Sequence, residues 1–217
     1  MIDGFRWGRR FRAARKWSNR VLRKIAPLFN GDVLNVSGWQ DEDKEGCHYR
    51  NYFTSATSYA LTNYGGYRGQ SSAIDINLDL EAELPKELHR RADIVFNHTT
   101  LEHVFDIFTA TRNLCLLSRD IVIVVVPAIQ EEHSATSFGD YWRFTSEGLR
   151  RLFESNGFSS IVLVSSPYNN CAVYHLLVAS RHPERWAGLS SINLGKVNDG
   201  KDLFRENIIE RLYSFFR

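Results

Sequence analysis

The stretch DIVIVVV, residues 120–126, sets the kind of fold that the rest of the chain can adopt. After its first residue it contains only β-branched apolar side chains, without the polar alternation expected of a strand that has one wet face. Such a run is typical of a central strand in a parallel sheet that helices cover on both sides. It ends at Pro127 and is too short to span a membrane. We therefore expect a buried strand at the centre of an α/β domain.

Further apolar runs lie on both sides of this strand, at 32–36, 57–64, 72–80, 92–98, 159–166 and 172–180. The earlier runs alternate with longer amphipathic segments, as in repeated units of strand, helix and parallel strand. Only a turn separates the last two runs, which predicts an antiparallel pair. The pattern predicts an open, doubly wound and mostly parallel sheet that ends in a hairpin.

A helix is predicted over residues 99–114, between the fourth and fifth strands. Thr99 would cap its first turn, with Glu102 three residues on as the second member of a capping box. His103 would then lie in the first turn, facing either the ends of the strands or a packing neighbour. The apolar stripe of this helix would consist of Leu101, Val104, Phe105 and Phe108.

A second helix should begin at Thr145 and end at the Asn-Gly pair 156–157. Near the end of the chain, apolar residues at helical spacing predict an amphipathic helix over about 202–216. The polar segment 181–201 before it has the composition of a linker. The expected organisation is an N-terminal helical arm at 1–30, an α/β domain at 31–180, and a linker with a C-terminal helix at 181–217.

The N-terminal arm carries most of the positive charge. Residues 1–25 contain nine Lys and Arg against one Asp, a net charge of +8, so the remainder carries −6 of the total of +2. Apolar residues recur along the arm at helical steps. This helix could dock on its own domain, or it could contact an anionic membrane surface or a protein partner. We do not expect nucleic acid as its partner.

The cysteines give information about the compartment. Cys47, Cys115 and Cys171 are odd in number and far apart, which argues against a disulfide framework and against a zinc knuckle. We therefore expect a cytoplasmic protein, with the arm as its one candidate for peripheral contact with a membrane, and we predict no metal site. The chain also lacks both a phosphate-binding loop with a Lys-Ser/Thr pair and a G-x-G-x-x-G motif after the first strand. Nucleoside-triphosphate and nicotinamide sites are thereby excluded.

Three segments resemble the class I S-adenosylmethionine-dependent methyltransferases. They are IDINLDLEAELP (74–85), ADIVFNHTTLEHVFD (92–106) and VVVPAIQEEHSATSFGDYWRFTSEGLRRLFESNGF (124–158). The last is similar to a branch of small methyltransferases, several of which resemble enzymes of glycan and cell-surface metabolism. The resemblance covers about residues 31–180 and implies a seven-stranded sheet of order 3-2-1-4-5-7-6, with strand 7 antiparallel and helices on both faces. It also implies S-adenosylmethionine as the cofactor.

The loop after the first strand departs from the family pattern. Where the family has an acid followed by G-x-G, this chain has Asn35, then Ser37, Gly38 and Trp39. Glycines at such positions permit positive φ and a close approach to the ligand, so the replacements put cofactor binding in question. The acid expected after the second strand is likewise an amide, Asn63, which can both donate and accept a hydrogen bond.

The resemblance and the predicted strand ends together assign residues to a site. The candidate cofactor residues are Asn35, Ser37, Gly38, Asn63, Asp79, Leu80, Asn97 and His98. Two have structural alternatives, because Gly38 could be a plain turn glycine and Asp79 could cap the next turn instead of binding the adenine amine.

The acceptor side would use residues that follow the fourth and fifth strands. His133 is the first candidate for the base that takes a proton from the acceptor, and His103 is the second. Asp140, Tyr141 and Arg143 are candidates for substrate binding, although Arg143 could simply pair with Asp140. The first hypothesis is a methyltransferase that acts on an oxygen of a small-molecule or glycan-linked acceptor. The alternative is a non-catalytic module of the same fold that binds a partner or a membrane.

Overall fold

The computed structural model describes residues 4–64, 76–136, 138–166 and 173–195. Its strands are β1 (Gly31–Val36), β2 (Ala56–Asn63), β3 (Ile76–Asn77), β4 (Ala92–His98), β5 (Ser118–Pro127), β6 (Ser159–Ser165) and β7 (Tyr174–Ser180). They form one seven-stranded sheet in the order β3-β2-β1-β4-β5-β7-β6. Neighbouring strands from β3 to β5 are parallel, whereas β7 runs antiparallel to both β5 and β6. The predicted fold class, strand order and hairpin are confirmed.

The register of the parallel strands brings their carboxyl ends to one edge of the sheet. Asn35 of β1 is paired with Leu61 of β2 on one side and with Phe96 of β4 on the other. His98, at the end of β4, is paired with Val125 near the end of β5. Side chains that follow β1, β2, β4 and β5 therefore meet at this edge, where α/β proteins bind their ligands.

The central strand β5 is buried on both faces, as its composition predicts. Ile121, Ile123 and Val125 enter a core on one face of the sheet, and Val122, Val124 and Val126 enter a core on the other. The alternation follows from the two-residue period of a strand. Each face accordingly needs its own covering layer, and the helices supply both.

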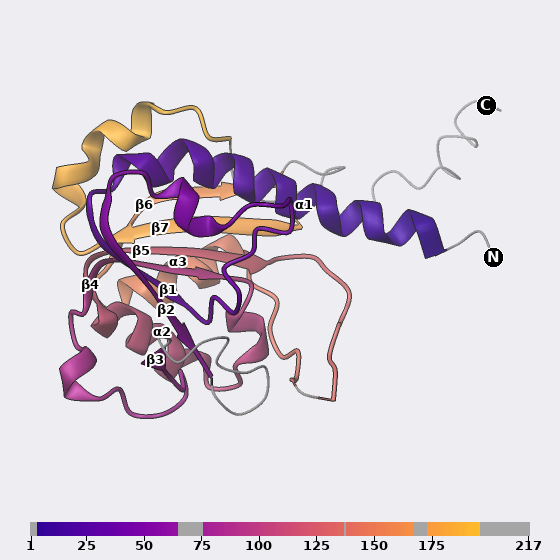
Figure 1. Ribbon diagram of the computed structural model, residues 1–217, viewed down its shortest axis with the longest axis horizontal. Helices are drawn as coiled ribbons and strands as arrows, with labels where there is room; N and C mark the ends of the chain where they lie inside the picture. The colour runs from indigo at the N-terminus through magenta and orange to yellow at the C-terminus, as the bar shows by residue number, and fades with distance from the viewer. Residues whose placement is uncertain (1–3, 65–75, 137, 167–172, 196–217) are drawn as a thin grey trace.

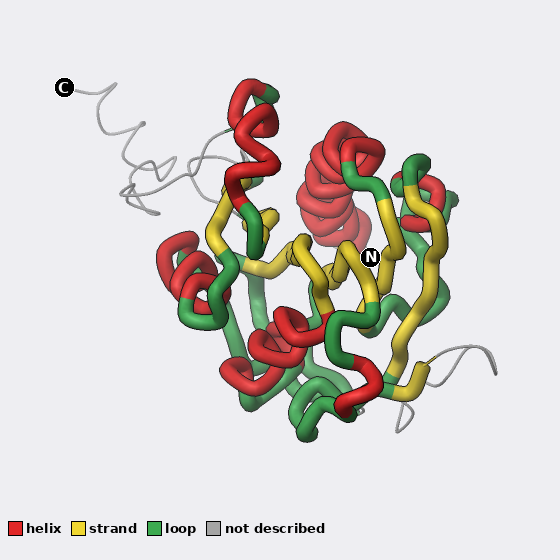
Figure 2. Tube along the Cα trace, turned by 90° about the vertical axis from the view of Figure 1, so that its left-hand side faces the viewer, coloured by secondary structure: helices red, strands yellow, loops and turns green. Residues whose placement is uncertain are grey.

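Three α-helices form these layers: α1 (Gly4–Ile25), α2 (Ile107–Leu117) and α3 (Ser146–Glu154). Figure 1 shows α1 on one face of the sheet and α2 on the other, and Figure 2 shows the twisted sheet end-on between these layers. The hydroxyl of Thr145 accepts a hydrogen bond from Gly148 N and caps α3. The predicted start of α3 is confirmed, whereas the helix ends at Glu154, two residues before the predicted Asn-Gly pair, in which Gly157 has φ +78°.

The second half of α1 is part of the core. Trp17, Leu22 and Ile25 are at most 8% exposed, and they belong to one buried cluster with side chains of β1, β4, β5 and β7. Docking on the domain, one of the three possibilities for the arm, is thus what residues 13–25 do. The first turns of α1 continue past the edge of the sheet (Figure 1). Among the residues that the structure describes, no helix is both long and apolar enough to cross a bilayer.

The segment after β4 does not form the predicted helix from Thr99. Thr99 adopts φ +50°, residues Leu101–His103 form a single 3-10 turn, and α2 begins only at Ile107. Its cap is Asp106, whose carboxylate accepts a hydrogen bond from Thr109 N at 3.0 Å. Phe105 and Phe108, which were predicted to be buried, are 67% and 72% exposed. The capping box with Glu102 is therefore wrong, because the chain bends away before a helix can start.

Two other predictions need correction. The third strand is Ile76–Asn77 in the described part of the chain, and positions 72–75 of the predicted strand lie outside it. In the predicted linker, Pro183–Ser191 forms 3-10 turns. Trp186 there packs edge-on against Phe29, and Leu189 is buried. Polar and glycine content hid these apolar contacts in the sequence. The predicted helix at 202–216 lies outside the described residues.

Candidate active site

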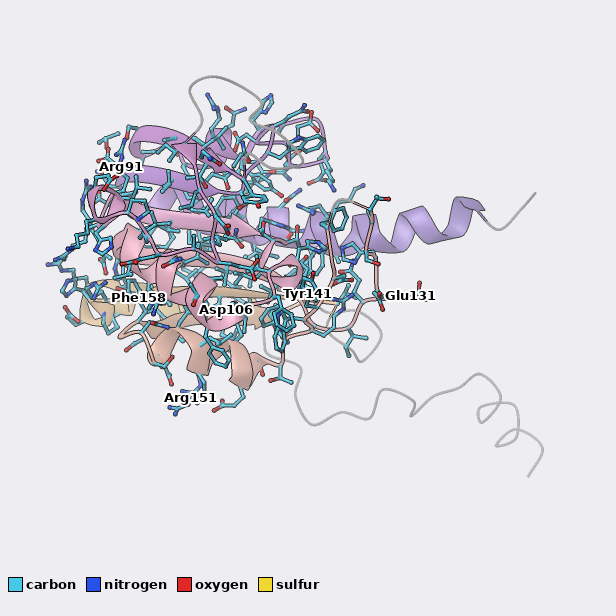
Figure 3. All side chains as sticks on the ribbon, turned by 90° about the horizontal axis from the view of Figure 1, so that it is seen from below. Arg91, Asp106, Glu131, Tyr141, Arg151 and Phe158 are labelled. Atoms are coloured by element: carbon cyan, nitrogen blue, oxygen red, sulfur yellow. The ribbon has the colours of Figure 1, made fainter. Side chains whose placement is uncertain are left out.

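A cavity of about 800 Å³ opens at the carboxyl edge of the sheet. Its walls come from the ends of β1, β2 and β4, from the loop after β5, and from α1 through Arg15 and Lys16. In Figure 3, Tyr141 and Glu131 lie toward the end of the molecule from which α1 projects, and Arg91 lies at the opposite end. The volume lies within the range of roughly 300–1,000 Å³ typical of sites for small molecules and cofactors.

The loop after β1 keeps a left-handed shape without the usual glycines. Ser37 has φ +56° and Trp39 has φ +47°, at the two positions where the resembling family has glycine. A non-glycine residue in this conformation costs on the order of 1 kcal/mol, so neighbouring interactions must hold the loop in place. Ser37, Gly38 and Trp39 all line the cavity, and Trp39 is 42% exposed. The replacements therefore leave room for a ligand.

Residues at the end of strand β2 hold the backbone of this loop by hydrogen bonds. Ser37 N donates to Thr62 Oγ1, Gly38 N donates to the Thr62 carbonyl, and both distances are 3.2 Å. Trp39 N donates to Asn63 Oδ1 at 2.7 Å, and Asn63 Nδ2 donates back to the Trp39 carbonyl. Asn63 thus lines the cavity but also fastens the loop. A ligand would meet amide groups that already donate elsewhere.

A buried carboxylate supports the same loop from behind. Asp41 is 2% exposed and accepts hydrogen bonds from Asn35 Nδ2 at 2.8 Å and from the Tyr59 hydroxyl at 2.6 Å. It also accepts from Arg50 N at 3.0 Å. Asn35 lines the cavity, although its amide is turned toward Asp41. The amide that replaces the family's acid is therefore satisfied within the protein.

The remaining candidate cofactor residues divide into two groups. Asp79 and Leu80 line the cavity after β3; Asp79 is exposed, and its Oδ1 accepts from Glu81 N, so it both faces the cavity and caps a turn. Asn97 is fully buried and donates to the Val36 carbonyl at 2.9 Å. It is not among the residues that line the cavity, and its amide is used in this bond to the end of β1. The structure thus does not bring Asn97 to the site.

His98 fastens α1 to the end of β4. Arg15 donates to His98 Nδ1 at 3.0 Å, and Ser18 Oγ lies 3.0 Å from His98 Nε2 while donating to the Arg15 carbonyl. Burial lowers the pKa of His98 well below its ordinary value, so the ring is neutral. Arg15 also donates to the hydroxyls of Tyr49 and Thr99. The sequence gives no signal for Arg15 in the site, because it is one of nine cations in the arm.

Two adjacent residues after β4 form the far end of the cavity. Glu102 is 1% exposed, and its Oε2 has no hydrogen-bond partner among the described residues. Burial raises the pKa of its carboxyl group to about 8. His103 lies beside it, with Nε2 at 3.8 Å from Glu102 Oε1 and Nδ1 at 2.6 Å from the Gly139 carbonyl. Burial also lowers the pKa of His103. The capping pattern in the sequence places Glu102 at a helix start and gives no indication of its burial at the cavity.

The loop after β5 adds His133 to this end. His133 N donates to Asp140 Oδ2 at 2.7 Å, and His133 Nδ1 lies 3.0 Å from the same oxygen. Arg143 donates to both oxygens of Asp140 at 2.6 Å, and these bonds hold the pKa of Asp140 below its usual range. The predicted alternative, in which Arg143 pairs with Asp140, is therefore confirmed. Tyr141 lines the cavity and is half exposed, whereas Asp140 and Arg143 stand behind His133.

Comparison with known proteins gives structural matches only. No family model matches the sequence, and no curated protein matches it either.

Solved structures match in fold. One is the 1,6-didemethyltoxoflavin-N1-methyltransferase of Burkholderia thailandensis with bound 1,6-didemethyltoxoflavin and S-adenosylhomocysteine (TM-score 0.54, 16% identity, 77% of each chain). Another comes from the complex between the Haloferax volcanii Trm112 methyltransferase activator and a methyltransferase (0.56, 12%, 82% of this chain and 94% of that one). A third is an S-adenosylmethionine-dependent methyltransferase from Clostridium acetobutylicum (0.53, 8%, 76% and 90%). At these identities the comparisons show that the chain has the Rossmann-like fold of these enzymes.

Proposed function

We propose that the chain is an S-adenosylmethionine-dependent methyltransferase that methylates an oxygen of a small-molecule or glycan-linked acceptor. The observation that carries the proposal is the cavity, which joins the loop after β1 to Glu102, His103 and His133 at the carboxyl edge of a methyltransferase-like sheet. The fold alone would not be enough, because one fold serves many activities.

The polar groups around the cavity suit the parts of this cofactor. Asp79 presents an exposed carboxylate that can accept a hydrogen bond from the adenine amine. Arg15 carries a positive charge and donates to the neutral side chains of Tyr49, His98 and Thr99, so its charge is available to the carboxylate of the methionine part. Ser37, Gly38 and Trp39 line the same cavity as these two groups.

The reaction is an in-line displacement at the methyl carbon. The acceptor oxygen forms a bond to that carbon while the carbon–sulfur bond breaks, and its electron pair stays on sulfur to give S-adenosylhomocysteine. The protein has to position the two molecules and remove the hydroxyl proton. We assign the proton to His133, which is 37% exposed and is held by Asp140. His103 is the alternative base.

One observation favours the second candidate function, a non-catalytic module. The N–H groups of residues 37–39 already donate to Thr62 and Asn63, and the loop keeps its shape without glycine. A fold that has lost its cofactor could persist in this state as a binding module. Its partner would then be a protein or an anionic membrane surface that contacts the basic arm, residues 1–25.

Calorimetric titration with S-adenosylmethionine and S-adenosylhomocysteine separates the two functions. The enzyme should bind both, and Asp79→Ala should weaken binding about tenfold, since a hydrogen bond to a charged group is lost. Glu83→Ala, a nearby exposed carboxylate that does not line the cavity, is the matched control and should bind like the parent protein. Folded protein that binds neither compound at millimolar concentration would rule out the enzyme. Unchanged affinity of Asp79→Ala would show that adenine binds elsewhere.

A further inference from the structure

Three side chains at the far end of the cavity form a cluster with the composition of a metal site. Glu102, His103 and His133 each place one potential ligand atom within 4.8 Å of those of the other two. Two of them come from the turn after β4 and one from the loop after β5, so the cluster exists only in the folded chain. All three line the cavity.

The two loops that carry these residues are fastened to each other. The Glu102 carbonyl accepts hydrogen bonds from Tyr141 N at 2.7 Å and from Trp142 N at 3.3 Å. The Trp142 indole donates to the carbonyls of Val104 and Phe105. These bonds fix the turn of Glu102 and His103 against the segment that holds His133 in place, as a metal site requires of its supporting groups.

Both histidines are held through Nδ1. His103 Nδ1 lies 2.6 Å from the Gly139 carbonyl, which can only accept, so Nδ1 carries the hydrogen and Nε2 keeps its lone pair. His133 Nδ1 lies 3.0 Å from Asp140 Oδ2 and 3.4 Å from the Glu131 carbonyl, which are also acceptors. A carbonyl or carboxylate bound to one ring nitrogen, with the other nitrogen open, is the usual arrangement of histidines that bind metal ions.

Glu102 supplies a second, independent observation that points to a cation as the ligand. Its carboxyl group is 1% exposed, and Oε2 has no hydrogen-bond partner among the described residues although it lies at the cavity. A buried carboxyl oxygen without a hydrogen-bond partner is costly, and a bound cation would supply that partner. Arg143 does not fill this role, because it donates to Asp140 and to the carbonyls of Gln130, Glu131 and Trp142.

We propose that Glu102, His103 and His133 bind one divalent first-row transition-metal ion at the acceptor end of the cavity, with Asp140 and Gly139 as supporting groups. Two imidazoles and one carboxylate suit Zn²⁺, Fe²⁺, Co²⁺ or Mn²⁺, whereas Mg²⁺ and Ca²⁺ favour sites made of oxygens alone. Three protein ligands leave at least one position open to the cavity, as in catalytic rather than structural sites.

The role of the ion rests on the proposed function, but the site itself does not. In a methyltransferase, the open position would bind the acceptor oxygen, and the ion would lower the pKa of the acceptor hydroxyl. The lone pair of His133 would then hold the ion instead of taking the proton, which would leave to solvent. The cluster would thus decide which acceptors react, favouring those whose hydroxyl can reach the ion.

The test is metal binding by the full chain, without cofactor or acceptor present. Chelator-treated, tag-free protein is titrated with Zn²⁺ in a calorimeter, and Co²⁺ is added separately to record its visible absorption. We expect one Zn²⁺ per chain. His133→Ala, His103→Ala and Glu102→Gln should each weaken binding by at least about tenfold and remove the Co²⁺ bands. His89→Ala, an exposed histidine outside the cavity, is the control and should bind like the parent.

Circular dichroism spectra show whether each variant is folded. His133 is 37% exposed, so its alanine variant should stay folded, and Glu102→Gln preserves the size of the buried side chain. The proposal is overturned if the folded parent binds no Zn²⁺, or if the three variants bind as tightly as His89→Ala. If the protein binds Zn²⁺ but not S-adenosylmethionine, the metal site is supported and the methyltransferase is refuted. If it binds S-adenosylmethionine but not Zn²⁺, the methyltransferase is supported and the metal site is refuted.

Discussion

The polar groups at the two ends of the cavity differ in how completely they are hydrogen-bonded within the protein. Near β1 and α1, Asp41, Asp43 and His98 each bind several partners, and the amides of the loop donate to β2. In the turn after β4 and the loop after β5, Glu102 leaves an oxygen unpaired, and His103 and His133 are each held through Nδ1 only. We call these the closed end and the open end.

This difference between the two ends indicates which residues stabilise the fold and which are free to bind a ligand. At the closed end the polar groups satisfy one another, so changes there should cost mainly folding free energy. At the open end the same kinds of groups keep unused donors or acceptors, and these are what a ligand can use. Mutations should therefore separate the two ends by the quantity that they change.

The largest expected effect is that of Asp43→Ala at the closed end. Asp43 is fully buried, and its carboxylate accepts from Arg23, from the Tyr52 hydroxyl and from the amides of Glu45 and Cys47. Removing it leaves the Tyr52 hydroxyl and the two amides without this acceptor, although Arg23 keeps Glu45, and should lower the free energy of unfolding by about 3–5 kcal/mol in urea titrations. Glu45→Ala removes the more exposed partner of the same Arg23 and should cost less than about 1 kcal/mol. If Asp43→Ala and Glu45→Ala lost the same unfolding free energy, the buried carboxylate would contribute no more to stability than the exposed one, contrary to the prediction.

Buried histidines give the next effect, through pH. Burial lowers the pKa of His98 well below its ordinary value and that of His175 to about 4, so at these two residues the unfolded chain binds more protons than the folded chain below about pH 6.5. Their contribution to stability is then fully present above about pH 6.5 and is lost as pH falls toward 4, by about 3 kcal/mol for His175 alone. His175→Gln should flatten the unfolding free energy over this range. A slope as steep as that of the parent would contradict the assignment.

The smallest effect concerns the loop after β1. A Cβ at Gly38 would lie 2.5 Å from Asn35 Nδ2 and 2.7 Å from Leu61 Cδ2, so Gly38→Ala should cost about 1–3 kcal/mol in unfolding free energy. Ser37 already has φ +56°, and Ser37→Gly should change stability by less than about 1 kcal/mol while removing strain. Urea midpoints measure both. Should Ser37→Gly cost as much as Gly38→Ala, the left-handed loop would owe its shape to the serine side chain.

The strands were predictable because their signal is local. The β-branched run at 120–126 and the hairpin pattern at 159–180 each depend on neighbouring residues, and the order of the sheet followed from the family resemblance. The start of α2 was not predictable in the same way. Thr99 and Glu102 satisfy the capping-box pattern and Asp106 only the preference for an N-cap residue, yet α2 starts after Asp106, and Glu102 is buried at the cavity.

The site was only partly predictable, for a related reason. Residues at strand ends, such as Asn35, Ser37 and His98, reach the cavity because topology puts them there. Asn97 is next to His98 in the sequence but faces the other side of the sheet, since successive side chains of a strand face opposite ways, and it donates to the Val36 carbonyl. Partners such as Arg15 come from a distant helix, and no local pattern indicates which of its many cations will turn inward.

The bond between Arg15 and His98 spans 83 positions of the sequence. A contact between residues so far apart in the sequence closes a large loop. The entropy lost in closing that loop is compensated only after many other contacts have formed. The sheet can begin to form from neighbouring strands, but the cavity has no α1 wall until the first helix meets the end of β4. A cavity built in this way is expected to form late in folding, so ligand binding would report on the native chain and not on its partly folded precursors.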